Sequence, residues 1–343
     1  MTASSPTWEL TTVADDEAVA FRGTDVRRLD GLEPDADHEL EGIAFRTLPR
    51  PGGERLATVA TVNDVHFGEE VCGVVEGSDV GPVLRSGPGE PPYPELMNRA
   101  AVAEIAALEP DVVVVKGDLT ANGSEEEYAA FLDCYGSAFG ERLVHVRGNH
   151  ESYVGAPFAA TPTQETQLPG VVLAVVDTSL PGSASGGVSA DQLDWLDELG
   201  ARADRPVLVF GHHHPWSPHS RSRPPGYFGI NPDDSERLIE VVARRPSLVG
   251  YFAGHTHRNR VRRFSATGEV PWVEVSATKD YPGAWAEYRV FDRGILQVLR
   301  RIADPAALAW TDRTRVMYAG LYADYAFGAL ADRCFPIWPR PTT

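Results

Sequence analysis

The stretch Val112-Val113-Val114-Val115-Lys116-Gly117-Asp118, residues 112–118, joins an unbroken apolar run to a glycine and an aspartate. Consecutive β-branched residues are typical of a strand that is buried on both faces, as in a sheet covered by helices. A glycine allows the chain to turn sharply as the strand ends. The stretch therefore predicts a central strand of an α/β sheet whose carboxyl end presents Asp118.

The same strand pattern recurs on both sides of this stretch. Further strands are predicted at residues 56–62, 143–146, 171–176, 207–210, 248–253, 272–275 and 288–291. Helical spacing is found at residues 94–108, 190–199 and 233–244, and Ser124 with Glu127 fits a capping box that opens another helix. Strand–helix alternation followed by consecutive strands predicts an α/β domain whose sheet becomes mixed at one end.

Aspartate, asparagine and histidine directly follow several of these strands. The segments are Asn63-Asp64-Val65-His66, Gly117-Asp118, Gly148-Asn149-His150-Glu151, Gly211-His212-His213-His214-Pro215 and Gly254-His255-Thr256-His257. A single histidine is more often a hydrogen-bonded structural residue than a ligand. In open α/β sheets, however, ligands gather outside the carboxyl ends of the strands. The repetition of the pattern therefore predicts one site to which all these segments contribute.

The ligand types of the predicted site indicate metal ions. Mixed carboxylate, amide and imidazole groups suit Mn, Fe, Zn, Co or Ni rather than a thiolate-type structural zinc site. The set exceeds what one ion can use, so two ions that share one carboxylate are expected. Such a pair, ~3.5–4 Å apart, clamps the oxygens of a phosphoryl group and makes hydroxide available near neutral pH.

Composition limits the partners of the 343-residue chain. Lys+Arg is 31 and Asp+Glu is 49, which gives a net charge of −18. An acidic surface repels nucleic-acid polymers and anionic membranes, so neither is an expected partner. No window reaches the ~18 apolar residues of a membrane span. Cys72, Cys134 and Cys334 are too few and too scattered for a disulfide framework, so a cytoplasmic location is expected.

Taken in order, these segments resemble the calcineurin-like metallophosphoesterases over roughly residues 55 to 295. The pattern Val176-Asp177-Thr178 with the later helix looks most similar to bacterial class III cyclic-nucleotide phosphodiesterases. The resemblance implies a four-layer αββα sandwich of two mixed β-sheets around a dinuclear centre of divalent or trivalent ions, with Mn, Fe or Zn as candidates. Purple acid phosphatases carry an iron-binding tyrosine at the position of Ala121, so a purple Fe(III) centre is not expected.

The resemblance also implies a role for each segment. Asp64, His66 and His257 would hold one ion, Asn149, His213 and His255 the other, and Asp118 would bridge them. His213 is selected because the family ligand precedes proline by two positions, which leaves His212 and His214 as neighbouring or pocket residues. His150 would bind phosphoryl oxygens, with Asn149, and assist the leaving group. Glu151 either orients His150 or caps the next turn.

Substrate contacts are less clearly marked in the sequence. The loop at residues 215–229 is basic and aromatic, so Arg221 or Arg223 could grip a phosphate, with His212 nearby; the alternative is an exposed proline-rich loop. Residues 68–92 form a long Gly/Pro-rich insertion that could act as a lid. The aromatic-rich tail, residues 310–338, is interpreted as core packing, a homo-oligomer contact or part of the pocket.

Three segments of chain are expected: a small N-terminal β-appendage of about four strands at residues 1–50, the metallophosphoesterase domain at 55–300, and the aromatic-rich extension at 301–343. The expected function is hydrolysis of a small phosphate ester through metal-bound hydroxide. A phosphodiesterase acting on cyclic nucleotides or glycerophosphodiesters is favoured. The alternatives are a phosphomonoesterase of the same fold and a non-catalytic scaffold, which the complete ligand set disfavours.

Overall fold

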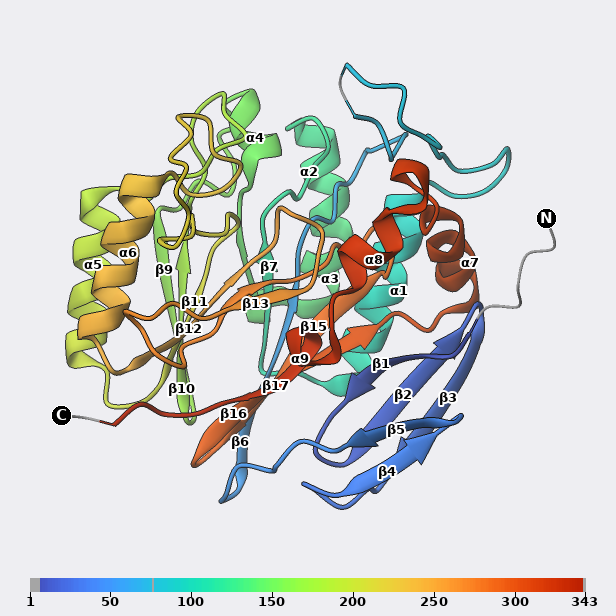
Figure 1. Ribbon diagram of the computed structural model, residues 1–343. Helices are drawn as coiled ribbons and strands as arrows, with labels where there is room; N and C mark the ends of the chain where they lie inside the picture. Colours follow the sequence, from blue (N-terminus) through green and yellow to red (C-terminus); the bar gives the residue numbers. More distant parts are fainter. Residues whose placement is uncertain (1–6, 76, 342–343) are drawn as a thin grey trace.

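The computed structural model describes residues 7–75 and 77–341 and contains two six-stranded sheets (Figure 1). The outer ends of the predicted terminal segments, residues 1–6 and 342–343, lie outside the described residues. The first sheet has the order β17-β16-β15-β6-β7-β8 and the second the order β13-β14-β12-β11-β10-β9. Both sheets are mixed, because β6, β7 and β8 are parallel, as are β10, β11, β12 and β14, while the remaining pairs are antiparallel.

The strands of the first sheet are β6 (Arg55–Val62), β7 (Val112–Lys116), β8 (Leu143–Val146), β15 (Ala284–Phe291), β16 (Gly294–Arg301) and β17 (Cys334–Ile337). Those of the second are β9 (Thr163–Leu168), β10 (Val171–Val176), β11 (Val207–Phe210), β12 (Leu248–Ala253), β13 (Arg260–Arg262) and β14 (Trp272–Glu274). The helices are α1 (Tyr93–Leu108), α2 (Glu125–Phe131), α3 (Ser137–Phe139), α4 (Asn149–Tyr153), α5 (Ala190–Arg202), α6 (Pro232–Arg244), α7 (Pro305–Thr314), α8 (Tyr322–Phe327) and α9 (Leu330–Arg333).

Three hydrophobic clusters separate four layers. One lies between the two sheets, one lies between the first sheet and α1, and one lies between the second sheet and the α5–α6 pair, which forms the left edge of Figure 1. Along β7, Val112 and Val114 enter the cluster between the sheets, whereas Val113 and Val115 face α1. This burial on both faces explains the unbroken valine run. The predicted four-layer sandwich of two mixed sheets is confirmed.

Capping residues define where α2, α5 and α6 begin. Ser124 accepts a hydrogen bond from the Glu127 amide at the start of α2, and the Glu127 carboxylate returns to the Ser124 amide, which confirms the predicted capping box. Ser189 and Gln192 form the same reciprocal pair at α5. At α6, Asn231 caps the helix and Pro232 takes the first helical position, where a missing amide hydrogen costs nothing.

The N-terminal strands form two small sheets beside the first large sheet (Figure 1). β1 (Glu9–Val13), β2 (Glu17–Arg22) and β3 (Asp25–Asp30) make one antiparallel sheet, and β4 (Asp37–Leu40) pairs with β5 (Ile43–Arg46). Five strands therefore occupy the segment for which about four were expected, because the polar strand β3 carries little apolar signal.

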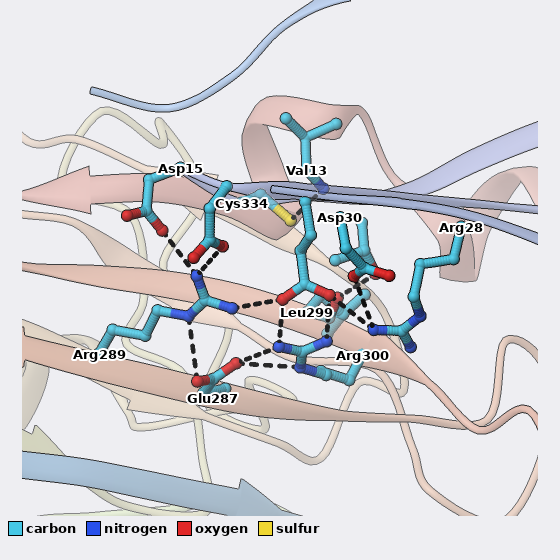
Figure 2. Close-up of polar contacts among 12 residues, drawn as sticks. Val13, Asp15, Arg28, Asp30, Glu287, Arg289, Leu299, Arg300 and Cys334 are labelled. Atoms are coloured by element: carbon cyan, nitrogen blue, oxygen red, sulfur yellow. Dashed lines mark hydrogen bonds and ion pairs between the residues drawn. The ribbon is translucent and has the colours of Figure 1, made fainter. Parts of the chain in front are cut away.

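An ion-pair network attaches these strands to the first large sheet (Figure 2). Arg289 on β15 pairs with Asp15 at 2.6 Å, with Asp16 at 2.7 Å and with Glu17. Arg300 on β16 binds Glu17 and Glu287, each at 2.6 Å. Because Glu287 is fully buried, its charge depends on these guanidinium groups.

Four strands lacked a clear sequence signal: β9, β13, β16 and β17. β9 is the edge strand Thr-Gln-Glu-Thr-Gln-Leu, none of whose residues is buried, so it lacks the alternating apolar pattern of a half-buried strand. Among the described residues, no helix has the length and apolar character that crossing a membrane requires.

Candidate metal centre

The segments that follow β6, β7, β8, β11 and β12 meet at one edge of the two sheets. Backbone hydrogen bonds join them: the Asp64 amide donates to Gly117 O at 3.2 Å, and the Gly254 amide donates to His212 O at 2.9 Å. The Asp64 bond joins the ends of β6 and β7 in the first sheet. The Gly254 bond joins the ends of β12 and β11 in the second sheet. A bond from the His255 amide to Asp64 Oδ1, 3.1 Å, links the two sheets. The residues predicted as metal ligands therefore lie together.

Asp118 lies at the centre of this cluster. Its Oδ2 is 3.5 Å from His66 Nε2, 3.3 Å from His212 Nε2 and 4.0 Å from His150 Nε2. Its Oδ1 accepts a hydrogen bond from the His150 amide at 3.1 Å. One carboxylate thus faces imidazoles supplied by three different strand ends.

Two groups of metal-type ligands flank Asp118. Asp64, His66 and His257 form one group, and His212, His213 and His255 form the other, with the ligand atoms of each group within 4.8 Å of one another. The Nε2 atoms of His66, His213 and His255 are buried and have no hydrogen-bond partner among the described residues. A buried imidazole nitrogen without a partner is costly unless it binds something. The donor set therefore fits metal ions.

The titration of these imidazoles fits the same interpretation. Burial lowers the pKa of His66, His213 and His255 well below 6.5, so these rings are neutral at pH 7, as metal ligands must be. Burial also acts to lower the pKa of His212, but the charge of Asp118 outweighs it and raises the pKa to about 9.

The three consecutive histidines, residues 212–214, differ in their hydrogen-bond partners. His213 Nδ1 contacts Thr178 Oγ1 at 2.9 Å, which leaves Nε2 facing the site. His212 uses both nitrogens, since Nδ1 donates to Lys116 O at 2.8 Å and Nε2 lies 3.0 Å from Asn149 Oδ1. His214 Nε2 contacts the Tyr227 hydroxyl at 2.9 Å. His212 is fully buried and does not line the cavity, so it is placed to orient Asn149 rather than to touch substrate.

Unusual backbone conformations concentrate at the site. Asp64, His66, Asp118, His255 and His257 all have positive φ, between 47° and 68°. Non-glycine residues rarely adopt this region, and such strain persists where the surroundings hold it for function. Gly148 allows the closest approach, because a Cβ at this position would overlap the Asp118 carboxylate and lie 2.5 Å from the Asp118 amide nitrogen.

His150 is oriented by the backbone and not by Glu151. Its Nδ1 donates to Ala121 O at 2.6 Å, and because a carbonyl only accepts, Nε2 is the ring atom left for substrate. Glu151 instead caps the turn: Oε1 accepts from the Thr120 amide and Oε2 from the Gly148 amide, both at 2.7 Å. Of the two alternatives for Glu151, the structure therefore shows the capping one.

Sequence reasoning missed a chain of contacts behind His257. Its Nδ1 lies 3.5 Å from Asp280 Oδ2, and Asp280 Oδ1 accepts a hydrogen bond from the Tyr322 hydroxyl at 2.5 Å. Lys279 Nζ lies 3.7 Å from Asp280 Oδ2 and also pairs with Glu69. A carboxylate behind a ligand histidine fixes its orientation and basicity. No local pattern marks Asp280, because His257 and Tyr322 are distant from it in sequence.

A cavity of about 610 Å³ opens above the cluster. Its floor consists of His66, Asp118, Asn149, His150, His255 and His257. Its walls come from residues 71–75, Tyr153, Phe228 and the C-terminal residues Tyr318, Leu321, Tyr322 and Tyr325. The tail therefore serves both the pocket and the core, since Trp310 stacks on Tyr93 at 4.3 Å between ring centroids.

The two arginines expected at the rim do not line this cavity. Arg223 is paired with Asp233 and Glu236, both at 2.5 Å, so its charge is already balanced. Within the 215–229 loop, Phe228 is the residue that reaches the cavity, where its ring stacks on His255 at 3.9 Å.

Comparison with known proteins agrees with this geometry. The calcineurin-like phosphoesterase family model matches residues 57–259, more than half of the chain. The chain belongs to this family. In calcineurin-like phosphoesterases a dinuclear divalent centre is expected, and the Asp and His groups described above could hold it.

Several relatives of this phosphoesterase are named as phosphodiesterases. A glycerophosphodiester phosphodiesterase of Enterobacter lignolyticus is 31% identical over 47% of this chain and 61% of that protein. A cAMP/cGMP dual specificity phosphodiesterase of Mycobacterium tuberculosis is 31% identical over 32% of this chain and 38% of that protein. The chain thus spans less than two thirds of either relative. A dimetal phosphatase of Danio rerio shares the fold, with a TM-score of 0.53, 16% identity, and coverage of 73% of this chain and 98% of that one.

Proposed function

We propose that this protein is a dinuclear-metal-dependent phosphodiesterase acting on a small phosphate ester, with cyclic nucleotides and glycerophosphodiesters as the first candidates. The observation that carries the proposal is the position of Asp118 between the two candidate ligand groups. Its Oδ2 lies 3.5 Å from His66 of the first group and 3.3 Å from His212, which directly precedes His213 of the second group. The relatives support a diester substrate by their names, glycerophosphodiester and cAMP/cGMP phosphodiesterase. Manganese, iron and zinc are the proposed metals, because all accept carboxylate and imidazole ligands.

In this proposal Asp64, His66 and His257 hold one ion, Asn149, His213 and His255 hold the other, and Asp118 bridges them. When bound, two such cations neutralise phosphoryl oxygens and supply a water of lowered pKa as nucleophile. Asn149 is held from two sides, by His212 at 3.0 Å from its Oδ1 and by its own Nδ2 donating to Tyr153 Oη at 3.1 Å. These contacts hold the amide in place, and its oxygen is the atom that would bind the second ion.

His150 is proposed to act on the substrate directly. Its Nδ1 is occupied by Ala121 O, and its partly exposed ring lines the cavity. Nε2 is therefore the atom that binds a phosphoryl oxygen or passes a proton to the departing oxygen.

Metal content and substrate preference together test the proposal. After reloading with Mn²⁺, Fe²⁺ or Zn²⁺, about two ions per chain are expected by elemental analysis. Bis-p-nitrophenyl phosphate should then be hydrolysed with a higher kcat/KM than p-nitrophenyl phosphate. A clear preference for the monoester would support the phosphomonoesterase alternative, and binding of less than one ion per chain would support the scaffold alternative.

We also propose the three-part organisation of the chain, residues 1–50, 55–300 and 301–343, and a cytoplasmic location. The cysteines support the latter, because Cys72, Cys134 and Cys334 are all free and buried. A homo-oligomer remains part of the proposal for the aromatic extension, and the sedimentation coefficient of the purified protein tests it.

A further inference from the structure

Exposed apolar side chains gather on the wall of the active-site cavity. Six of its residues are large hydrophobic side chains that remain exposed to solvent: Val74, Val75, Tyr153, Phe228, Leu321 and Tyr325, here called the apolar rim. Leu321 is 69% exposed, Val74 60% and Phe228 53%. Single exposed hydrophobic residues are ordinary, but a set gathered around one cavity marks a surface that contacts an apolar partner.

The rim is assembled from four separate parts of the chain. Val74 and Val75 come from the insertion after β6, Tyr153 from the end of α4, Phe228 from the loop before α6, and Leu321 and Tyr325 from the C-terminal segment around α8. Contributions from such distant segments are not a by-product of one amphipathic helix.

Positive charge is almost absent from the walls. Among the described residues that line the cavity, Lys279 is the only lysine or arginine, and its side chain is 4% exposed and paired with Glu69 and Asp280. No free cation is therefore available beyond the proposed metal ions to receive a second phosphate or a carboxylate. The part of the substrate that rests on the walls is therefore not expected to carry a further negative charge.

Three of the six rim side chains are aromatic. The Phe228 ring lies against His255, with 3.9 Å between the ring centroids. The ring centroids of Tyr153 and His150 are 5.5 Å apart. Both rings thus stand directly beside floor residues, where the organic group of a bound ester emerges. Aromatic side chains favour flat partners, which they meet by stacking or edge-on contact.

We propose that the apolar rim selects phosphodiesters with one phosphate whose second ester group, the one that does not leave, carries an aromatic ring such as an aryl group or a nucleobase. Small polar groups such as glycerol, and groups with a further anionic centre, are discriminated against. This inference rests on the proposed phosphodiesterase function and narrows its substrate class.

The test compares diesters that share one leaving group. The substrates are bis-p-nitrophenyl phosphate, thymidine 5′-(p-nitrophenyl phosphate) and methyl p-nitrophenyl phosphate, each rate being divided by that of uncatalysed hydrolysis. With the Mn-loaded protein, kcat/KM for both ring-bearing substrates should exceed that for the methyl ester by roughly tenfold or more. A strong preference for the thymidine ester would identify a nucleobase as the ring, and a strong preference for the aryl ester would identify a simple aryl group.

Matched variants locate the preference at the rim. Val74→Ser with Leu321→Ser should lower the ratio of ring-bearing to methyl kcat/KM by about threefold or more, because two apolar contacts are lost. The control is Val83→Ser with Val316→Ser, residues that are 49% and 51% exposed but lie outside the cavity, and the ratio should not change. Equal kcat/KM for the methyl and ring-bearing esters, or an equal loss in both double variants, would overturn the inference.

A binding measurement separates this inference from the proposed function. If no diester is hydrolysed by the metal-loaded protein, the proposed function fails, and calorimetric titration with phenylphosphonate and methylphosphonate still tests the rim. Tighter binding of phenylphosphonate that is weakened by the Val74/Leu321 variant supports the inference. Equal binding of the two phosphonates refutes it.

Discussion

At the scale of single residues, Asp118 and His150 have neighbouring positions but different proposed roles. Asp118 Oδ2 lies between His66 and His212, 3.5 Å and 3.3 Å away. If Asp118 bridges the two ions, Asp118→Ala would leave two cations without a shared anion to offset their repulsion. We expect this variant to lose at least one ion and at least about a thousandfold in kcat. Elemental analysis and bis-p-nitrophenyl phosphate turnover measure the two losses. Full activity would exclude Asp118 as the bridge.

His150→Ala serves as the matched comparison for Asp118→Ala. His150 Nε2 lies 4.0 Å from Asp118 Oδ2, on the cavity side. We expect both ions to remain bound and kcat to fall by about a hundredfold or more, since only proton transfer and phosphoryl contact are removed. Loss of metal from this variant would mean that His150 is a ligand instead.

His213 and His212 are also neighbours with different proposed roles, a metal ligand and a support for Asn149. The structure leaves His213 Nε2 without a partner among the described residues, whereas both nitrogens of His212 are engaged. We expect His213→Ala to retain about one ion per chain, and His212→Ala to retain both ions with weaker binding because Asn149 loses its support. Competition with a chromogenic chelator gives the affinities. The reverse pattern would exchange the two roles.

At the scale of elements, α8 is coupled to the metal centre through one hydroxyl. Tyr322 is buried and donates to Asp280, which stands behind His257. We expect Tyr322→Phe to weaken binding of one ion by up to about tenfold while the fold is kept, because only one oxygen is removed. Tyr318→Phe is the control, since Tyr318 lines the same cavity but does not bond Asp280 within the described chain. Identical metal affinity in wild type and Tyr322→Phe would show that this contact does not reach the centre.

At the scale of the whole molecule, the ion-pair network of Figure 2 attaches the N-terminal strands to the first large sheet. This network makes the free energy of unfolding depend on pH. Burial acts to raise the pKa of Glu287, but the charges of Arg300, Arg289 and Arg55 outweigh it and lower the pKa from 4.5 to about 2. A carboxylate with a lowered folded-state pKa stabilises the fold above its unfolded pKa. We therefore expect about 3 kcal/mol to be lost as the pH falls from 4.5 to about 2.

Urea unfolding at pH 7, 4.5 and 3 measures this dependence. Glu287→Gln should lower stability at pH 7 by about 3 kcal/mol, because it leaves buried guanidinium groups without their anion, and should flatten the acid dependence. Glu236→Gln breaks an exposed pair with Arg223 and should cost less than about 1 kcal/mol. Equal effects of the two substitutions would show that the network does not hold the strands in place.

The sequence alone determined the central strands and the residues at their ends. The apolar runs of β6, β7, β8, β11 and β12 are local signals, and each is followed at once by its Asp, Asn or His, so both sheet and floor of the site could be predicted. Only the tertiary structure placed Tyr322 behind Asp280, brought His212 against Asn149, and brought Leu321 and Val74 to one rim. These contacts join residues that are far apart in the chain or that differ only in side-chain direction, and neither property leaves a periodic pattern in sequence.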